Sequence, residues 1–246
     1  MQPMIKDEKI YLYGKHALRE ALLAKPQAVQ KVFLDSNAQS DAELTELLKK
    51  HSINSTSMKE DAKRKVDGDA VHQGVIAVIN PLKMYVELDE VLKKIEGNPC
   101  FVLLDELQDP HNVGAIIRSA VAFGASAILM PEHNQAPLTG VVIKTSAGMA
   151  FRIPIVRIGN VNQTMRLLKD KGFWTYGLMM GGTSVLKDTT FDTPTVFVVG
   201  NESDGIRQKT LELCDITLSI PMQPGCESLN ASVAASVVLY EWSRGK

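Results

Sequence analysis

The sequence predicts an α/β protein whose main sheet is mostly parallel and covered by helices on both faces, preceded by a smaller α/β unit. From residue 101 onward, short apolar runs alternate with amphipathic helical patterns across short connections. This alternation is typical of parallel sheets, whose strands are buried on both faces. Residues 81–97 interrupt the pattern with a turn-like stretch and one short amphipathic helix, which we expect to link two domains, 1–80 and 98–246.

The first eighty residues carry their own helices and strands. Apolar residues at helical spacing predict the helices, and short apolar runs bounded by turn residues predict the strands. The expected helices lie at 13–24 and 41–51, and the expected strands at 31–35 and 74–79. The charged segment 59–69 predicts an exposed loop. We therefore expect a small α/β domain in front of the main sheet.

The larger domain is expected to contain six strands and five helices. The expected strands lie at 101–105, 127–130, 155–158, 174–179, 195–199 and 216–220. The expected helices lie at 113–123, 139–148, 161–171, 206–213 and 229–242. Ligands of parallel sheets bind beyond the carboxyl ends of the strands, so the loops that follow these strands are the candidates for a functional site.

Composition excludes several classes of protein. The 246 residues include 27 Lys and Arg against 28 Asp and Glu, for a formal net charge of −1, which argues against a polybasic binder or an acidic tail. No apolar run is long enough to span a membrane, and the N-terminus lacks the apolar stretch of a secretory signal, so we expect a cytoplasmic protein. The three cysteines lack C-x-x-C spacing and the five histidines lack ligand spacing, which predicts reduced thiols and no metal site.

The first candidate loop follows the strand at 101–105 and leads into a helix that carries Arg118. Asn112 can cap this helix by accepting a hydrogen bond from a backbone N–H group. Gly114 and Arg118 lie four residues apart on one helical face, where the guanidinium is well placed to bind a phosphate. A capped helix with a surface arginine explains the same residues equally well.

The second candidate loop, residues 199–205, again joins a buried strand to a helix. Gly200 and Gly205 allow the backbone to approach a ligand closely. Glu202 and Asp204 place carboxylates where a phosphate-binding loop would avoid them, which favours a ligand with hydroxyl groups or a cation. A plain turn is the alternative interpretation.

The third candidate loop, residues 220–232, precedes the last helix. Ser228 is a natural N-cap for that helix. Capping does not explain Asn230, a poor helix former in the expected first turn. We therefore expect that something other than local helix propensity selects Asn230.

Jointly and in this order, the three loops form a specific pattern. The matching stretches are D-P-H-N-V-G-A-I-I-R at 109–118, G-N-E-S-D-G-I at 200–206, and I-P-M with S-L-N-A-S-V-A at 220–234. They resemble the three signature motifs of the SpoU/TrmH family of the SPOUT superfamily. These are S-adenosylmethionine-dependent RNA ribose 2′-O-methyltransferases. Y-G-K-H-A-L at 13–18 resembles the start of the small RNA-binding domain found in many members. Within the family, the resemblance is nearest to enzymes that modify a guanosine of 23S ribosomal RNA.

The resemblance implies a SPOUT-type fold with a deep C-terminal trefoil knot, and a homodimer whose active site lies near the subunit interface. It also implies S-adenosylmethionine as the methyl donor, with no metal. The residues that match catalytic positions are Asn112, Arg118, Glu202, Ser228 and Asn230, and those that match donor-binding positions are Gly200, Ile220 and Leu229.

The resemblance also suggests roles for these side chains. Arg118 is expected to contact the phosphate of the target nucleotide and to help activate the 2′-OH, by positioning and charge because a guanidinium stays protonated. Glu202 is expected to orient Arg118. Asn201 and Ser203 depart from the small residues common in the second motif, which is expected to alter the flexibility of that loop.

The implied partner is RNA, either 23S ribosomal RNA or an assembling large ribosomal subunit, with no membrane. Because the net charge is near zero, RNA contacts require a local basic patch, and the charged segment of the small domain is a candidate. That patch consists of Lys59, Lys63, Arg64 and Lys65. A tRNA 2′-O-methyltransferase and a catalytically inactive RNA-binding or ribosome-assembly protein are the alternatives. A nicotinamide-dependent oxidoreductase is disfavoured because the G-x-G-x-x-G pattern is missing.

Overall fold

The computed structural model describes residues 9–58, 74–226 and 228–245. Contacts group the chain into an N-terminal unit, Met1–Tyr85 with Leu138–Arg152, and a C-terminal unit, Val86–Pro137 with Ile153–Lys246. The expected domain 98–246 is thus interrupted by a segment that packs with the N-terminal unit. The expected loop at 59–69 and its four basic residues lie outside the described residues.

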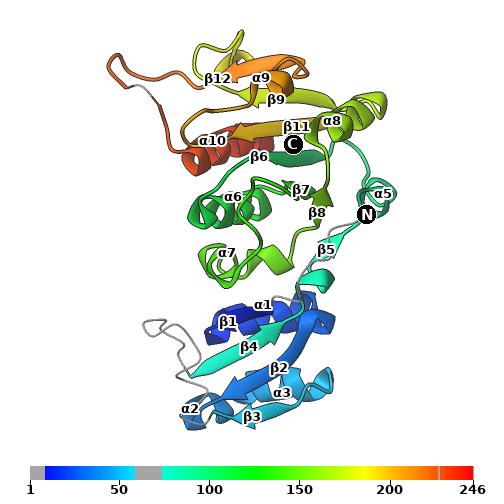
Figure 1. The fold of residues 1–246 in the computed structure, drawn as a ribbon, viewed down its shortest axis with the longest axis vertical. Helices are drawn as coiled ribbons and strands as arrows, with labels where there is room; N and C mark the ends of the chain where they lie inside the picture. Colours follow the sequence, from blue (N-terminus) through cyan, green and yellow to red (C-terminus); the bar gives the residue numbers. More distant parts are fainter. Residues whose placement is uncertain (1–8, 59–73, 227, 246) are drawn as a thin grey trace. The chain divides into compact units, whose positions relative to one another are not determined.

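The N-terminal unit contains a four-stranded sheet in the order β1-β4-β2-β3 (Figure 1). Strands β1 and β2 pair antiparallel with β4, and β3 pairs parallel with β2. The strands are β1 (Ile10–Tyr13), β2 (Val29–Leu34), β3 (Ser55–Ser57) and β4 (Val75–Ile79). Among the described residues, the α-helices of this unit are α1 (Lys15–Ala24), α2 (Ser36–Gln39), α3 (Ala42–Lys50) and α7 (Gly140–Thr145).

Two contacts explain why residues 138–152 belong to the N-terminal unit. Helix α7 packs against β1, and a Cβ atom at Gly140 would clash with the backbone oxygen of Tyr11. Glycine therefore permits this close approach. The guanidinium of Arg152 forms an ion pair with Glu20 of α1, whose side chain is largely buried. Close backbone packing and a partly buried ion pair together attach the segment to this unit.

The C-terminal unit contains an eight-stranded sheet in the order β10-β12-β9-β11-β6-β7-β8-β5. From β10 to β8, every neighbouring pair is parallel, which confirms the predicted sheet type. The strands are β5 (Tyr85–Val86), β6 (Cys100–Asp105), β7 (Ala127–Pro131), β8 (Ile155–Ile158), β9 (Trp174–Leu178), β10 (Ser184–Val185), β11 (Thr195–Gly200) and β12 (Ile216–Ser219).

Helices cover both faces of this sheet. The helices are α5 (Leu88–Leu92), α6 (Pro110–Ala122), α8 (Val161–Asp170), α9 (Gln208–Leu211) and α10 (Ala231–Arg244). Val196 and Val198 of β11 share a core cluster with Met165 of α8. Successive strand residues point to opposite faces, so the other face of β11 meets α10, which also packs against α6 (red and green in Figure 1).

The contact between α6 and α10 is both polar and aromatic. The hydroxyls of Ser119 and Ser236 lie 2.7 Å apart, and the rings of Phe123 and Tyr240 meet edge to face at 5.7 Å. Trp242 near the end of α10 is almost fully buried, and burying a large apolar side chain contributes roughly 1.5–3 kcal/mol. These contacts fix α10 beside the helix that carries the first motif. The trefoil knot stays a prediction.

None of the described helices is long and apolar enough to cross a membrane. The three cysteines are free, with Cys100 buried, Cys214 half-buried and Cys226 exposed. Burial raises the pKa of the Cys214 thiol to about 12, with a further contribution from Asp215.

Candidate active site

The loops after β9, β11 and β12 line a cavity of about 450 Å³ at the carboxyl edge of the sheet. We call it the donor cavity, after the methyl donor that the sequence resemblance implies. Five of the eight predicted site residues line it: Gly200, Glu202, Ile220, Ser228 and Leu229. The second and third sequence motifs therefore meet at one place, although they are separated by β12 in the chain.

Asn112 and Asn230 connect the first motif to the other two. The Oδ1 atom of Asn230 accepts hydrogen bonds from the backbone N–H groups of Ser232 and Val233. Its Nδ2 group must then face Asn112, and it donates to the Oδ1 atom of Asn112 at 2.9 Å. Asn112 in turn donates from Nδ2 to the Oε1 atom of Glu202 at 2.9 Å. The helix cap thus sets the orientation of both amides and the position of the carboxylate.

The caps of α6 and α10 differ from those predicted. Asp109, not Asn112, caps α6, because its side chain accepts from the backbone N–H of His111 at 2.8 Å. Pro110 follows at the first helical position, where its fixed backbone angle favours a helix start. Asn230, not Ser228, caps α10. Because Asp109 supplies the cap, the amide of Asn112, which is only 6% exposed, donates to Glu202 instead.

Arg118 lies apart from this network. It is exposed on α6, and within residues 9–58, 74–226 and 228–245 no hydrogen bond or ion pair engages its guanidinium. The carboxylate of Glu202 contacts Asn112 instead. The expectation that Glu202 orients Arg118 is therefore not met within the chain.

The second motif forms a tight loop. The backbone groups of Asn201 and Gly205 exchange hydrogen bonds of 2.9 and 3.1 Å. A Cβ atom at Gly200 would collide with the backbone of Gly205, so only glycine fits there. The Asn201 side chain accepts from the backbone N–H of Ser203 at 2.8 Å and donates to the backbone oxygen of Glu106 at 2.8 Å. The unusual Asn201 therefore anchors the loop rather than loosening it.

An ion pair that sequence reasoning missed holds the end of this loop. The carboxylate of Asp105, fully buried at the end of β6, accepts from Nη2 of Arg207 at 2.6 Å and from its backbone N–H at 2.9 Å. A second ion pair joins Arg207 to Glu106 at 2.8 Å. Burial lowers the pKa of Arg207, but Asp105 and Glu106 outweigh it and raise that pKa overall. The only sequence signal was an acidic residue ending a buried strand.

The chemistry of the donor cavity suits a ligand that contains a nucleoside. Leu178, Ile220 and Leu229 provide apolar contact for a heterocycle. Glu202 and Asp204 provide carboxylates that can accept hydrogen bonds from hydroxyl groups. Apolar walls with a few convergent polar groups are typical of small-molecule sites. Among the described residues, no group of three or more His, Cys, Asp and Glu side chains could hold a metal ion.

Comparison with known families agrees with this architecture. Residues 99–240 match the SpoU rRNA Methylase family, and residues 11–85 match the domain described as RNA 2′-O ribose methyltransferase substrate binding. The chain belongs to the SpoU rRNA methylase family. The predicted family and SPOUT-type fold are confirmed, with a mostly parallel catalytic sheet and a small N-terminal domain.

Individual relatives match along almost the whole chain. The 23S rRNA (guanosine-2′-O-)-methyltransferase RlmB of Neisseria meningitidis is 36% identical over 236 residues, covering 95% of this chain and 94% of the relative. The enzyme of the same name from Nitrosomonas europaea is 33% identical, covering 95% and 91%. The crystal structure of the SpoU methyltransferase AviRb from Streptomyces viridochromogenes in complex with AdoMet has a TM-score of 0.82 at 27% identity, covering 96% and 90%.

Proposed function

We propose that this protein transfers the methyl group of S-adenosylmethionine to the ribose 2′-OH of a guanosine in 23S ribosomal RNA. The observation that carries the proposal is the chain of hydrogen bonds from Asn230 through Asn112 to Glu202, which brings all three motifs to the donor cavity. Relatives named for this reaction, at 33–36% identity over most of the chain, support the choice of substrate.

The donor cavity would hold S-adenosylmethionine, which supplies a methyl group on a sulfonium sulfur. Gly200 permits the tight loop on one side, and Ile220 and Leu229 provide apolar contact on the other. Met179 and Met180 after β9 are 38% and 63% exposed and line the same cavity. Exposed apolar side chains beside a cavity are expected where a ligand covers them.

Methyl transfer to a hydroxyl is an in-line displacement, so its rate depends on alignment of the two reactants. Asn112, Asn230 and Glu202 fix one wall of the site, and Ser228 is exposed at its edge. Arg118 would bind the phosphate of the target nucleotide and hold the ribose hydroxyl in place. A guanidinium cannot accept the hydroxyl proton at neutral pH, so Arg118 acts by positioning and by charge.

The proposal includes a homodimer. Arg118 has no partner among the described residues, and α10 exposes Val233 and Tyr240, which are 46% and 53% accessible. Association of two copies would cover such apolar side chains and bring Arg118 of one copy toward the donor cavity of the other. The N-terminal unit would bind the RNA, and the site of action would be the cytoplasm, on free 23S RNA or on an assembling large subunit.

Mapping of 2′-O-methyl groups on total RNA, from cells with and without the gene, tests the substrate. We expect loss of one methylated guanosine in 23S ribosomal RNA. Relatives from Staphylococcus epidermidis and Mycobacterium avium carry names that include both tRNA and rRNA, which keeps tRNA as the second candidate. Loss of methylation in tRNA alone would overturn 23S ribosomal RNA as the substrate, but 2′-O-methyl transfer to RNA would remain the reaction.

A further inference from the structure

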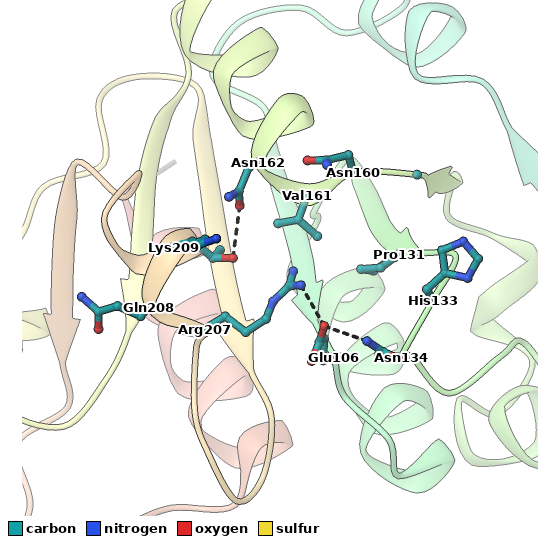
Figure 2. Close-up of a pocket in the computed structure, with 12 residues that line it drawn as sticks. Glu106, Pro131, His133, Asn134, Asn160, Val161, Asn162, Arg207, Gln208 and Lys209 are labelled. Atoms are coloured by element: carbon teal, nitrogen blue, oxygen red, sulfur yellow. Dashed lines mark hydrogen bonds and ion pairs between the residues drawn. The ribbon is translucent and has the colours of Figure 1, made fainter.

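A second cavity of about 300 Å³ lies at the carboxyl ends of β6, β7 and β8 (Figure 2). It shares no lining residue with the donor cavity. The two cavities are nevertheless linked by one segment, because residues 200–205 line the donor cavity and residues 207–210 line the second cavity. A ligand in the second cavity would therefore touch the continuation of the loop that holds Glu202.

The charges of the second cavity do not favour an isolated anion. The side chain of Arg207 points toward Glu106, and the two form an ion pair at 2.8 Å (Figure 2). The same guanidinium is also engaged by the buried Asp105. One cation is thus matched by two carboxylates, and a phosphate placed here would face Glu106. The remaining lining is rich in uncharged amides.

Two of these amides retain free donors. Asn160 uses its Oδ1 atom to cap α8, accepting from the backbone N–H of Gln163 at 3.0 Å. Asn162 uses its Oδ1 atom to accept from the hydroxyl of Thr210 at 3.3 Å. In the described parts of the chain, neither Nδ2 group has a hydrogen-bond partner. Each amide therefore keeps two N–H donors for a ligand.

Two other side chains at this cavity are also unengaged. The exposed ring of His133 stands at one side of the opening and offers an aromatic face (Figure 2). Lys209 lines the cavity from α9, and its ammonium has no ion-pair partner among the described residues. An aromatic face, free amide donors and a single cation at the rim form a set that suits a nucleobase attached to a backbone phosphate.

We propose that the second cavity binds an unpaired nucleotide of the RNA substrate, other than the one that is methylated. Its base stacks on His133 and accepts hydrogen bonds from Asn160 and Asn162, while Lys209 contacts the adjoining phosphate. Folded RNA is recognised largely through unpaired bases, which explains how a chain of net charge −1 can select its substrate. This inference rests on the proposed function.

Hydrogen bonds and an ion pair also connect the second cavity to the loop that lines the donor cavity. The carboxylate of Glu106 accepts from Arg207 and from Asn134, and both of these residues line the second cavity. The backbone oxygen of Glu106 accepts from the side chain of Asn201 in the second motif. A base that settles against Glu106 therefore rests on the residue that anchors the donor loop.

The test uses full-length variants, an unmodified 23S RNA transcript and S-adenosylmethionine. We expect His133→Ala to raise KM for the transcript roughly tenfold, and His133→Phe, which keeps an aromatic face, to restore it. Asn160→Ser keeps a capping oxygen but removes the amide donor, so KM should also rise. Lys209→Ala should raise KM severalfold, while Lys171→Ala, an equal charge change at the end of α8 away from this cavity, should not.

The dissociation constant of S-adenosylmethionine, measured by calorimetry, should stay the same in every variant. KM values within twofold of the parent for His133→Ala, Asn160→Ser and Lys209→Ala would overturn the inference. An equal rise in Lys171→Ala or a loss of donor affinity would also overturn it. If the parent protein transfers no methyl group, the proposed function fails by itself. In that case, the affinity for the transcript, measured without the donor, still tests whether the second cavity binds RNA. Equal affinity of the parent and the cavity variants would overturn the inference.

Discussion

The Nδ2 group of Asn230 donates a hydrogen bond of 2.9 Å to Oδ1 of Asn112, although the two residues are 118 positions apart in the chain. The same Asn230 caps α10 through its other amide atom. One side chain therefore starts the last helix and positions the residue that holds Glu202. This double use explains why an asparagine occupies a position where serine would serve the helix equally well.

Substitution of Asn230 separates its two uses. Asn230→Ser keeps a cap and Asn230→Ala does not, so Asn230→Ala should lower the unfolding free energy by about 1 kcal/mol more than Asn230→Ser does. Both variants lose the hydrogen bond to Asn112, so methyl transfer should fall roughly tenfold or more in each. Chemical denaturation and single-turnover kinetics measure the two effects. Parental turnover in Asn230→Ser would contradict the role of the amide.

Arg118 should matter for transfer and not for donor binding. Because its guanidinium is exposed and unpaired among the described residues, Arg118→Ala should not disturb the fold. We expect transfer to fall more than hundredfold, while the calorimetric affinity for S-adenosylmethionine stays unchanged. Arg118→Lys should recover only part of the rate, because lysine cannot bind a phosphate with two parallel N–H groups. Near-normal turnover in Arg118→Ala would refute this role.

The tight second loop predicts an effect on donor binding at Gly200. An added Cβ atom would meet the backbone of Gly205, so Gly200→Ala must displace the loop. We expect at least a tenfold weaker affinity for S-adenosylmethionine, measured by calorimetry. Gly245→Ala is the matched control, because its Cβ atom would sit at 3.7 Å from the backbone oxygen of Trp242, an ordinary contact. Equal donor affinity in both variants would show that the loop does not contact the donor.

Asp215 predicts a pH dependence of stability. Burial raises its pKa, but hydrogen bonds from Lys169 and Thr175 outweigh burial and lower the pKa overall. The folded state thus favours the carboxylate, and its stabilisation is present above the unfolded pKa of about 3.9 and is lost as pH falls through the lower folded pKa. Because Asp215 is exposed and solvent screens its ion pair with Lys169, Asp215→Asn should cost at most about 1 kcal/mol at pH 7 and progressively less below pH 4.

Denaturant unfolding at several pH values measures this difference, with Asp170→Asn at the exposed end of α8 as the control. The control should match the parent protein within experimental error at every pH. A cost for Asp215→Asn that is the same at pH 3 and pH 7 would show that its charge does not stabilise the fold.

The sequence predicts most strands of the main sheet, because the central ones, such as β6 and β7, are short apolar runs buried on both faces. The two-residue strands β5 and β10 were not expected. All six expected strands are present within one residue at each end, for example 155–158 as β8 (Ile155–Ile158). Strand β1 (Ile10–Tyr13) was missed, and the helix expected at 13–24 begins only at Lys15. Tyr13 is compatible with either a helix or a strand. The pairing of β1 with β4, which is distant in sequence, makes it part of a strand.

The candidate site was predictable in its members but not in its contacts. Asp109 and Asn112 are both good caps three residues apart, as are Ser228 and Asn230 two apart, so local propensity cannot choose between them. Tertiary contacts decide which residue caps the helix, because the side chain of Asn112 donates to Glu202 instead of capping α6. The ion pair between Asp105 and Arg207 joins positions 102 apart and left no local pattern to read.

Methyl transfer by the purified protein tests the central claim most directly. The protein is incubated with S-adenosylmethionine and an unmodified 23S RNA transcript, and the methylated positions are located by mass spectrometry, with Arg118→Ala as the control. We predict one guanosine with a methyl group on its ribose 2′-oxygen, absent from the control reaction. A methyl group on a base, or no transfer to the transcript or to assembling large subunits, would contradict the account.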